Sequence, residues 1–270
     1  MSSTARGLFT ELSRPGPHPV LRGELALAGL PGIVCTPRSG LGLPAVAFGH
    51  GWLQPSERYH GLLRHLASWG IVAASPNTQR GPLSSHRLYA GDLRTALDVC
   101  VGVRLGDGSI SVAPDRLGLA GHSTGGGAAI LAAAEDPRVR AVATVAVAEV
   151  QPTAVSAAAR CAMPGLHVAG GRDLIAPAAG HAEAVARAWG GPVSLRSVAK
   201  ATHLGFTEGR HWSQLLLDGK PERRTHRIAS ALLAAFFLVH LAGAQRYRPL
   251  LDENIKRCPI DFERSPALAR

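Results

Sequence analysis

The sequence is poor in the residues that mark disulfide-rich, metal-binding and disordered proteins. It has four cysteines among 270 residues, and they lie far apart with no C-x-x-C pair. The cysteines are Cys35, Cys100, Cys161 and Cys258. Their spacing excludes a disulfide framework and a zinc site, and we expect no metal or other cofactor. Charged residues make up only 18% of the chain, which is too few for a disordered or solvating protein.

The chain also lacks features that would recognise nucleic acid. Its net charge is +10, but the basic residues are scattered, only three tyrosines are present and no recognition motif occurs. We therefore interpret the charge as a basic surface and expect no nucleic-acid partner.

No segment has the pattern of a signal peptide or a membrane span. The first twenty residues contain no apolar core, from which we expect a cytoplasmic protein. One apolar run covers residues 228–244, but it is short for a span and His240 interrupts it. We expect this run to be a buried helix and the protein to have no integral membrane part.

Apolar runs that alternate with helical patterns predict a sheet covered on both faces. The predicted strands are 20–27, 33–36, 43–48, 71–75, 116–120, 139–147, 166–169 and 193–198. The predicted helices are 56–69, 87–104, 128–134, 177–189 and 221–241. Such alternation builds β-α-β units, so we expect an α/β fold with a doubly wound, mostly parallel sheet of about eight strands.

No internal repeat or low-complexity linker divides the chain. We expect one domain over residues 20–245, preceded by a lead-in over 1–19 and followed by a tail, 246–270, packed on the domain. The strand predicted to end near Val147 is followed closely by the one that starts near Leu166, which leaves no room for a lid domain.

The sequence Gly121-His122-Ser123-Thr124-Gly125 is organised as a nucleophile elbow. It lies between a predicted strand and a predicted helix, which is the context that a G-x-S-x-G motif requires. The two glycines remove side chains that would clash around a serine held at the tip of so tight a turn. We predict that Ser123 is a nucleophile.

A serine nucleophile needs a base to take its proton and an acid to orient that base. Asp173 follows a predicted strand end in a Gly-Gly-x-Asp loop, and His203 follows the last predicted strand. We predict that Asp173 and His203 complete a triad with Ser123. Glu149 is the alternative acid because it also follows a strand end. Asp136 lies at the far end of the helix after the elbow, on the wrong side of the sheet, and we do not expect His211, eight residues after His203, to be the base.

The negative charge that develops on the substrate oxygen needs fixed hydrogen-bond donors. We predict the backbone N–H groups of Trp52 and Thr124 for this role. Thr124 directly follows the nucleophile, and His50-Gly51-Trp52 follows the strand over 43–48. We expect His50 to be a structural hydrogen-bonding residue.

These motifs resemble those of α/β-hydrolases, in the branch that holds dienelactone-hydrolase-like and chlorophyllase-like enzymes and cutinase-like polyester hydrolases. The resemblance covers about residues 20–249. His50-Gly51-Trp52 is similar to the oxyanion loop of that group, 121–127 to its elbow, 173–177 to its acid loop and 202–203 to its histidine loop. The resemblance implies the α/β-hydrolase fold. It also implies that Trp52 stands where polyester hydrolases often have an aromatic residue, and Thr124 where they often have a methionine.

The chain departs from members of this branch at two places. Polyester hydrolases carry a tryptophan after the strand that follows the elbow helix, whereas residues 146–150 contain none. Dienelactone hydrolases proper use a cysteine nucleophile where this chain has Ser123.

The motifs together predict a serine carboxylic-ester hydrolase that acts through an acyl-enzyme on small to medium acyl esters. Its partner would be a small-molecule ester. Acyltransferase or perhydrolase chemistry with the same triad is an alternative, as is polyester hydrolysis. A non-catalytic binding protein of this fold is disfavoured because such relatives usually lose a triad residue.

Overall fold

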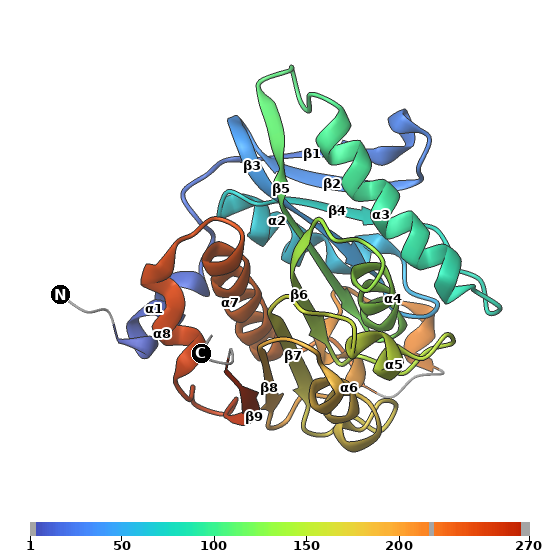
Figure 1. The fold of residues 1–270 in the computed structure, drawn as a ribbon, viewed down its shortest axis with the longest axis vertical. Helices are drawn as coiled ribbons and strands as arrows, with labels where there is room; N and C mark the ends of the chain where they lie inside the picture. Colours follow the sequence, from blue (N-terminus) through green and yellow to red (C-terminus); the bar gives the residue numbers. More distant parts are fainter. Residues whose placement is uncertain (1–3, 216–218, 266–270) are drawn as a thin grey trace.

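The apolar runs of the sequence form a twisted sheet through the middle of the molecule (Figure 1). The computed structural model describes residues 4–215 and 219–265. Within these ranges the sheet has nine strands in the order β1-β2-β4-β3-β5-β6-β7-β8-β9. The strands are β1 (Val20–Glu24), β2 (Gly32–Pro37), β3 (Gly40–Gly49), β4 (Val72–Pro76), β5 (Ile110–His122), β6 (Val139–Val145), β7 (Gly165–Gly170), β8 (Val193–Val198) and β9 (Ile260–Arg264).

The six strands from β4 to β8 in this order are parallel, and the strands at the edges are antiparallel. Every residue of β4 and β7 is buried, as expected for strands that are covered on both faces. The predicted α/β fold with a mostly parallel sheet is confirmed. All strands predicted from the sequence are present.

Helices cover both faces of the sheet. They are α1 (Ala5–Leu12), α2 (His60–Ser68), α3 (His86–Gly102), α4 (Thr124–Ala133), α5 (Ala154–Ala158), α6 (Ala182–Ala188), α7 (Arg223–His240) and α8 (Arg248–Asp252). One core joins the sheet to α1, α2, α7 and α8, and a second core joins its other face to α3, α4, α5 and α6 (Figure 1). Only the short helix α5 lies between β6 and β7, so no lid is inserted there.

The apolar run over 228–244 forms most of α7, as predicted. Leu232, Phe237 and the residues between them are buried against the sheet and the neighbouring helices. No helix in the described part of the chain is long and apolar enough to cross a membrane.

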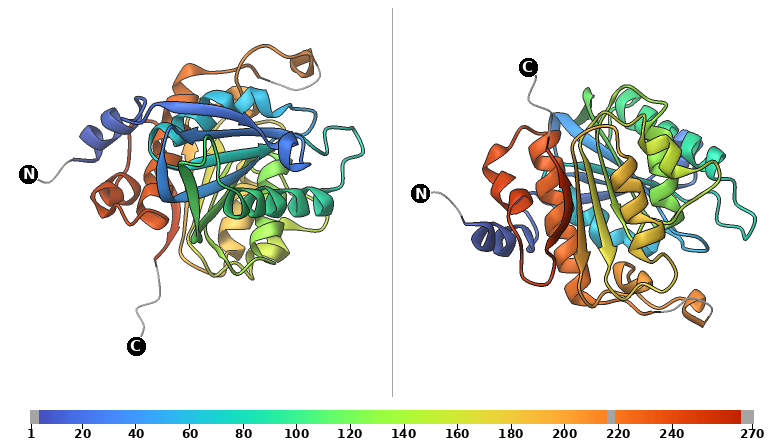
Figure 2. Two further views of the ribbon diagram at one scale, coloured as in Figure 1. Left: turned by 90° about the horizontal axis from the view of Figure 1, so that it is seen from above. Right: turned by 60° about the horizontal axis from the view of Figure 1, so that its bottom comes forward.

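The ends of the chain are more ordered than the sequence predicted. In the lead-in, Leu8 and Leu12 bury one face of α1 against α7 and α8, and the Thr4 side chain caps the helix. In the tail, β9 pairs with β8, so 193–198 is not the last strand. Figure 2 shows α1 and α8 together beside α7. The boundaries at residues 19 and 245 remain predictions. Residues 1–3 of the predicted lead-in, 266–270 of the predicted tail, and 216–218 lie outside the described residues.

A buried arginine holds the C-terminal segment to the sheet. Arg196 on β8 is fully buried, and burial lowers its pKa. Its guanidinium donates hydrogen bonds to the backbone carbonyls of Leu251 (2.5 Å), Glu253 (3.0 Å), and Leu250 and Cys258 (both 3.4 Å). Several of these carbonyls belong to the end of α8, where the helix dipole favours a cation.

We predict that Arg196→Met lowers the free energy of unfolding by about 2–4 kcal/mol, because four backbone carbonyls, three of them in buried residues, lose their donor. Arg160→Met is the control, since Arg160 is exposed, and it should change the value by less than about 0.5 kcal/mol. Urea denaturation measures both. Equal losses in the two variants would show that Arg196 does not anchor the segment.

Candidate active site

A sharp turn between β5 and α4 carries Ser123. β5 ends at His122 and α4 begins at Thr124, so one residue joins strand to helix. The Ser123 backbone has φ 54° and ψ −127°, a conformation that is rare outside glycine and costs on the order of 1–3 kcal/mol. The segment therefore has the strand–turn–helix geometry of a nucleophile elbow.

Glycines allow the backbone to crowd around this turn. A Cβ on Gly125 would collide with the backbone of Gly49 and His50, and a Cβ on Gly121 would collide with the backbone of Gly125. A Cβ on Gly49 would lie 2.6 Å from the Gly125 carbonyl oxygen. The end of β3, the end of β5 and the start of α4 can meet closely only because all three positions lack side chains.

The structure brings Ser123, Asp173 and His203 together. The Nε2 atom of His203 lies 2.8 Å from Ser123 Oγ, and its Nδ1 atom lies 2.7 Å from Asp173 Oδ2. Asp173 follows β7, and His203 begins a 3₁₀ turn, η4 (His203–Phe206), after β8. The three side chains thus lie at the carboxyl edge of the parallel strands, where open α/β sheets bind ligands.

The charge state of Asp173 follows from its surroundings. Burial acts to raise the pKa of this carboxyl, but the hydrogen bond and charge of His203 lower it, as do the N–H groups of Ala176 and Ile175. These N–H groups lie 2.8 and 2.9 Å from Oδ1. The net pKa is lowered, so Asp173 is ionised near neutral pH. It can accept the Nδ1–H of His203, which leaves Nε2 to accept the Ser123 proton.

The alternative acids and histidine lie elsewhere. The Glu149 carboxylate accepts hydrogen bonds from the N–H groups of Ala154 and Val155 at the start of α5. Asp136 pairs with Arg138 beyond the end of α4. His211 contacts Ser213 instead of the serine of the turn. The geometry therefore favours Asp173 and His203.

Both segments that carry the predicted oxyanion donors adjoin Ser123, because Thr124 directly follows it in the chain and the loop after β3 packs against it. A Cβ added to Gly51 would lie 3.3 Å from the Cβ of Ser123, so the loop that carries Trp52 approaches the serine closely. In residues 4–215 and 219–265, neither the Trp52 N–H nor the Thr124 N–H donates to a protein acceptor. Both remain available to a ligand oxygen. The Trp52 ring is about one-third exposed, and its Nε1–H donates to the Pro82 carbonyl.

A buried hydrogen-bond chain connects the histidine loop to the oxyanion loop. The His203 carbonyl oxygen lies 3.0 Å from His122 Nε2, and His122 Nδ1 lies 2.8 Å from the Tyr59 hydroxyl. That hydroxyl accepts the Gly51 N–H at 3.0 Å. Burial lowers the pKa of His122 far below its ordinary value, helped by the charge of His203, so the ring is neutral. It then donates through Nε2 and accepts the Tyr59 proton at Nδ1.

Two further side chains stabilise the same loops. The guanidinium of Arg58 donates to Gln54 Oε1, to the Glu208 carbonyl and to Thr207 Oγ1, at 2.7–2.9 Å. It thus joins the segment after Trp52 to the segment after His203. The ring nitrogens of His50 contact the carbonyls of Gly51 and Thr78, in keeping with its predicted structural role.

Sequence reasoning missed Arg58 and Tyr59. Their signal was an adjacent Arg-Tyr pair directly after the predicted oxyanion loop, at the start of the predicted helix 56–69. A buried arginine and a buried tyrosine at such a place need polar partners. The sequence did not indicate that those partners would come from the elbow and from the histidine loop.

We predict that Tyr59→Phe lowers the free energy of unfolding by about 1–3 kcal/mol, because it leaves the Gly51 N–H and His122 Nδ1 buried without a partner. Tyr247→Phe is the matched control. The Tyr247 hydroxyl bonds to exposed Arg246 and to Glu11, where water can replace it, so the loss should be below about 1 kcal/mol. Urea denaturation compares them, and equal losses would contradict the connecting role of Tyr59.

A family model described as PET hydrolase-like matches residues 35–191, which is more than half of the chain. The matched segment runs from β2 to the end of α6 and includes Ser123 and Asp173, whereas His203 lies beyond it. No curated protein matches the chain.

Proposed function

The chain belongs to the PET hydrolase-like family and is an ester-hydrolysing enzyme, and we propose that it cleaves carboxylic esters through an acyl-enzyme on Ser123. One observation carries the proposal: the continuous contact from Asp173 through His203 to Ser123 at a strained elbow. A family of ester hydrolases and a base within reach of an activated serine support the same chemistry.

The steps follow from the geometry. His203 Nε2 takes the Ser123 proton while Oγ attacks the ester carbonyl carbon and its π electrons move to the oxygen. The N–H groups of Trp52 and Thr124 donate to that oxyanion. Collapse of the intermediate breaks the bond to the leaving oxygen, which takes the proton from His203 and departs as the alcohol. Water, deprotonated by His203, then attacks the acyl-enzyme, and the acid leaves as the proton returns to Ser123.

The lack of an inserted lid between β6 and β7 supports small to medium acyl esters as substrates. Only residues 146–164 lie between β6 and β7, and they carry one five-residue helix. Without a lid to displace, activity should not depend on an aggregated lipid surface.

A cytoplasmic location is part of the same proposal, supported by four buried free thiols, which are typical of a reducing compartment.

A polyester is the second candidate substrate. The family description favours it, and an open site would allow a long chain to pass across Ser123. The partly exposed Trp52 ring beside the site could pack against an aromatic unit. To test this substrate, the release of soluble products from a polyester film is measured with the wild type and with Ser123→Ala. Release by the wild type alone would show polyester cleavage in addition to that of small esters.

We predict that Ser123→Ala lowers kcat/KM on short and medium p-nitrophenyl esters by three orders of magnitude or more, because the nucleophile is lost. Initial rates from acetate to palmitate measure it. Ser156→Ala, at an exposed serine, is the control and should match the wild type. Equal activity of Ser123→Ala and wild type would overturn the mechanism. A sharp rise in wild-type activity only above the aggregation threshold of a lipid ester would overturn the argument from the missing lid.

We predict that Asp173→Asn lowers kcat by about three to four orders of magnitude, because an amide stabilises the wrong His203 tautomer. Glu149→Gln keeps an acceptor for the start of α5 and should leave kcat within about twofold of wild type. Both are measured on p-nitrophenyl butyrate. A large loss in Glu149→Gln with little in Asp173→Asn would transfer the acid role to Glu149.

A further inference from the structure

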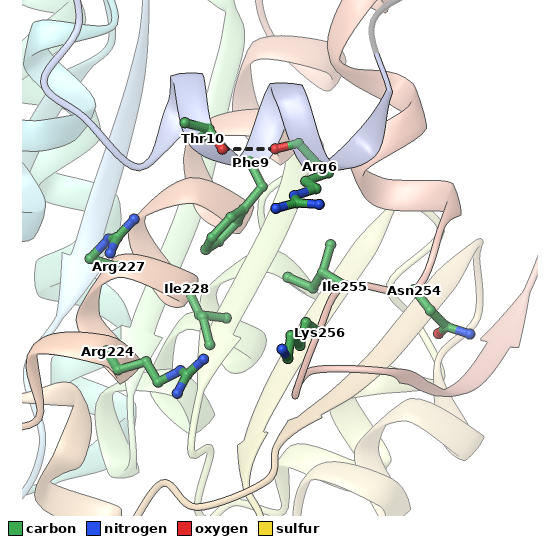
Figure 3. A pocket seen from close by; sticks show the side chains of 9 residues that line it. All are labelled: Arg6, Phe9, Thr10, Arg224, Arg227, Ile228, Asn254, Ile255 and Lys256. Carbon is green, nitrogen blue, oxygen red and sulfur yellow. Dashed lines mark hydrogen bonds between the residues drawn. The ribbon is translucent and has the colours of Figure 1, made fainter.

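A cavity of about 670 Å³ lies apart from the proposed catalytic residues. It is bounded by α1, by the first turns of α7 and by the segment between α8 and β9 (Figure 3). None of Ser123, Asp173 and His203 lines it. Its volume is within the range of small-molecule sites in proteins, roughly 300–1,000 Å³.

The polar lining of this cavity is positively charged. Arg6, Arg224, Arg227 and Lys256 line it, and no aspartate or glutamate does. None of the four cations forms an ion pair with a carboxylate in the described residues. Arg227 donates to Ser13 Oγ at 3.2 Å. Cations from three separate segments thus face one space without a counter-charge.

The inner surface of the cavity is apolar. Ile228 is 2% exposed and Ile255 is 9% exposed, and Phe9 is half-buried on α1. Figure 3 shows Arg6, Arg224 and Lys256 arranged around Phe9, Ile228 and Ile255. A ligand that matches this lining carries a compact negative group at the rim and a hydrocarbon group against the three apolar side chains.

We propose that this cavity binds an anionic amphiphile, a molecule with one carboxylate or phosphate group on an alkyl chain. A guanidinium recognises either group through charge-assisted hydrogen bonds, and Lys256 adds a point charge. The Phe9 ring, which is only half-buried, favours such a ligand over free inorganic phosphate, which would leave the ring in contact with water. The ligand could be a free acid or the headgroup of an anionic lipid. The site does not depend on the proposed catalytic mechanism.

The test compares three full-length proteins, of which the two variants carry the same net charge. Arg224→Gln/Lys256→Gln removes two cations of the cavity, and Arg104→Gln/Arg160→Gln removes two exposed cations elsewhere. The third protein is wild type. Calorimetry titrates each with octanoate below its aggregation threshold, with butyrate, and with 1-octanol. Sedimentation with phosphatidylglycerol or phosphatidylcholine vesicles tests the lipid source. Thermal unfolding and p-nitrophenyl butyrate hydrolysis check that each variant is folded.

We expect the wild type and the control variant to bind octanoate more tightly than butyrate or octanol. In the cavity variant, we expect the Kd for octanoate to be at least about tenfold higher. Binding of phosphatidylglycerol vesicles alone, lost in the cavity variant, would support the same site with a lipid headgroup as ligand. Equal octanoate binding by all three proteins would overturn the proposal, because binding at the proposed catalytic site is shared by all of them. Octanol binding as tight as octanoate binding would also overturn it, as would binding of neither octanoate nor phosphatidylglycerol vesicles.

Discussion

Close backbone packing around Ser123 is the constraint on which the rest of the site depends. The end of β3, the end of β5 and the start of α4 meet at distances that exclude a Cβ on Gly49, Gly121 or Gly125. This packing holds Ser123 at a positive φ and aims the first N–H groups of α4 toward the space above it. It also brings the loop after β3 beside the serine, where we propose that the Trp52 N–H acts with the Thr124 N–H as an oxyanion donor. A side chain at any of these glycines would separate the elements that form the site.

Buried polar contacts then connect the loops that the sheet only places near one another. His122, directly before Ser123 in the elbow, contacts both the histidine loop and Tyr59, and Tyr59 contacts the oxyanion loop. Arg58 makes a second connection between the same loops. Loops are the more mobile parts of a fold, and catalytic groups must hold their relative positions to a fraction of an ångström. The hydrogen bonds of Arg58, Tyr59 and His122 supply that restraint from one side of the site.

The two helical layers differ in what they contribute. The layer of α3, α4, α5 and α6 supports the elbow and the acid loop, and it uses Glu149 to cap α5. The layer of α1, α2, α7 and α8 is completed by both ends of the chain. Arg196 and the pairing of β9 with β8 secure the C-terminal end to the sheet, and α1 at the N-terminal end packs on α7 and α8. The cationic cavity occurs where these two ends meet the start of α7, so it exists only because residues far apart in sequence pack there.

The sequence by itself determined the α/β class, the order of the central strands and helices, and the residues of the elbow, acid loop and histidine loop. These features are local: apolar runs, helical spacing and a few glycines report the conformation of their own segment. It did not predict β9 or α1, because a five-residue edge strand and a two-turn helix carry too little periodicity. Tertiary structure alone decided that Asp173, and not Glu149, reaches His203, and that Arg58 and Tyr59 support the site. Such choices depend on which side chains meet across the fold, and a pattern read along one chain contains no distance between them.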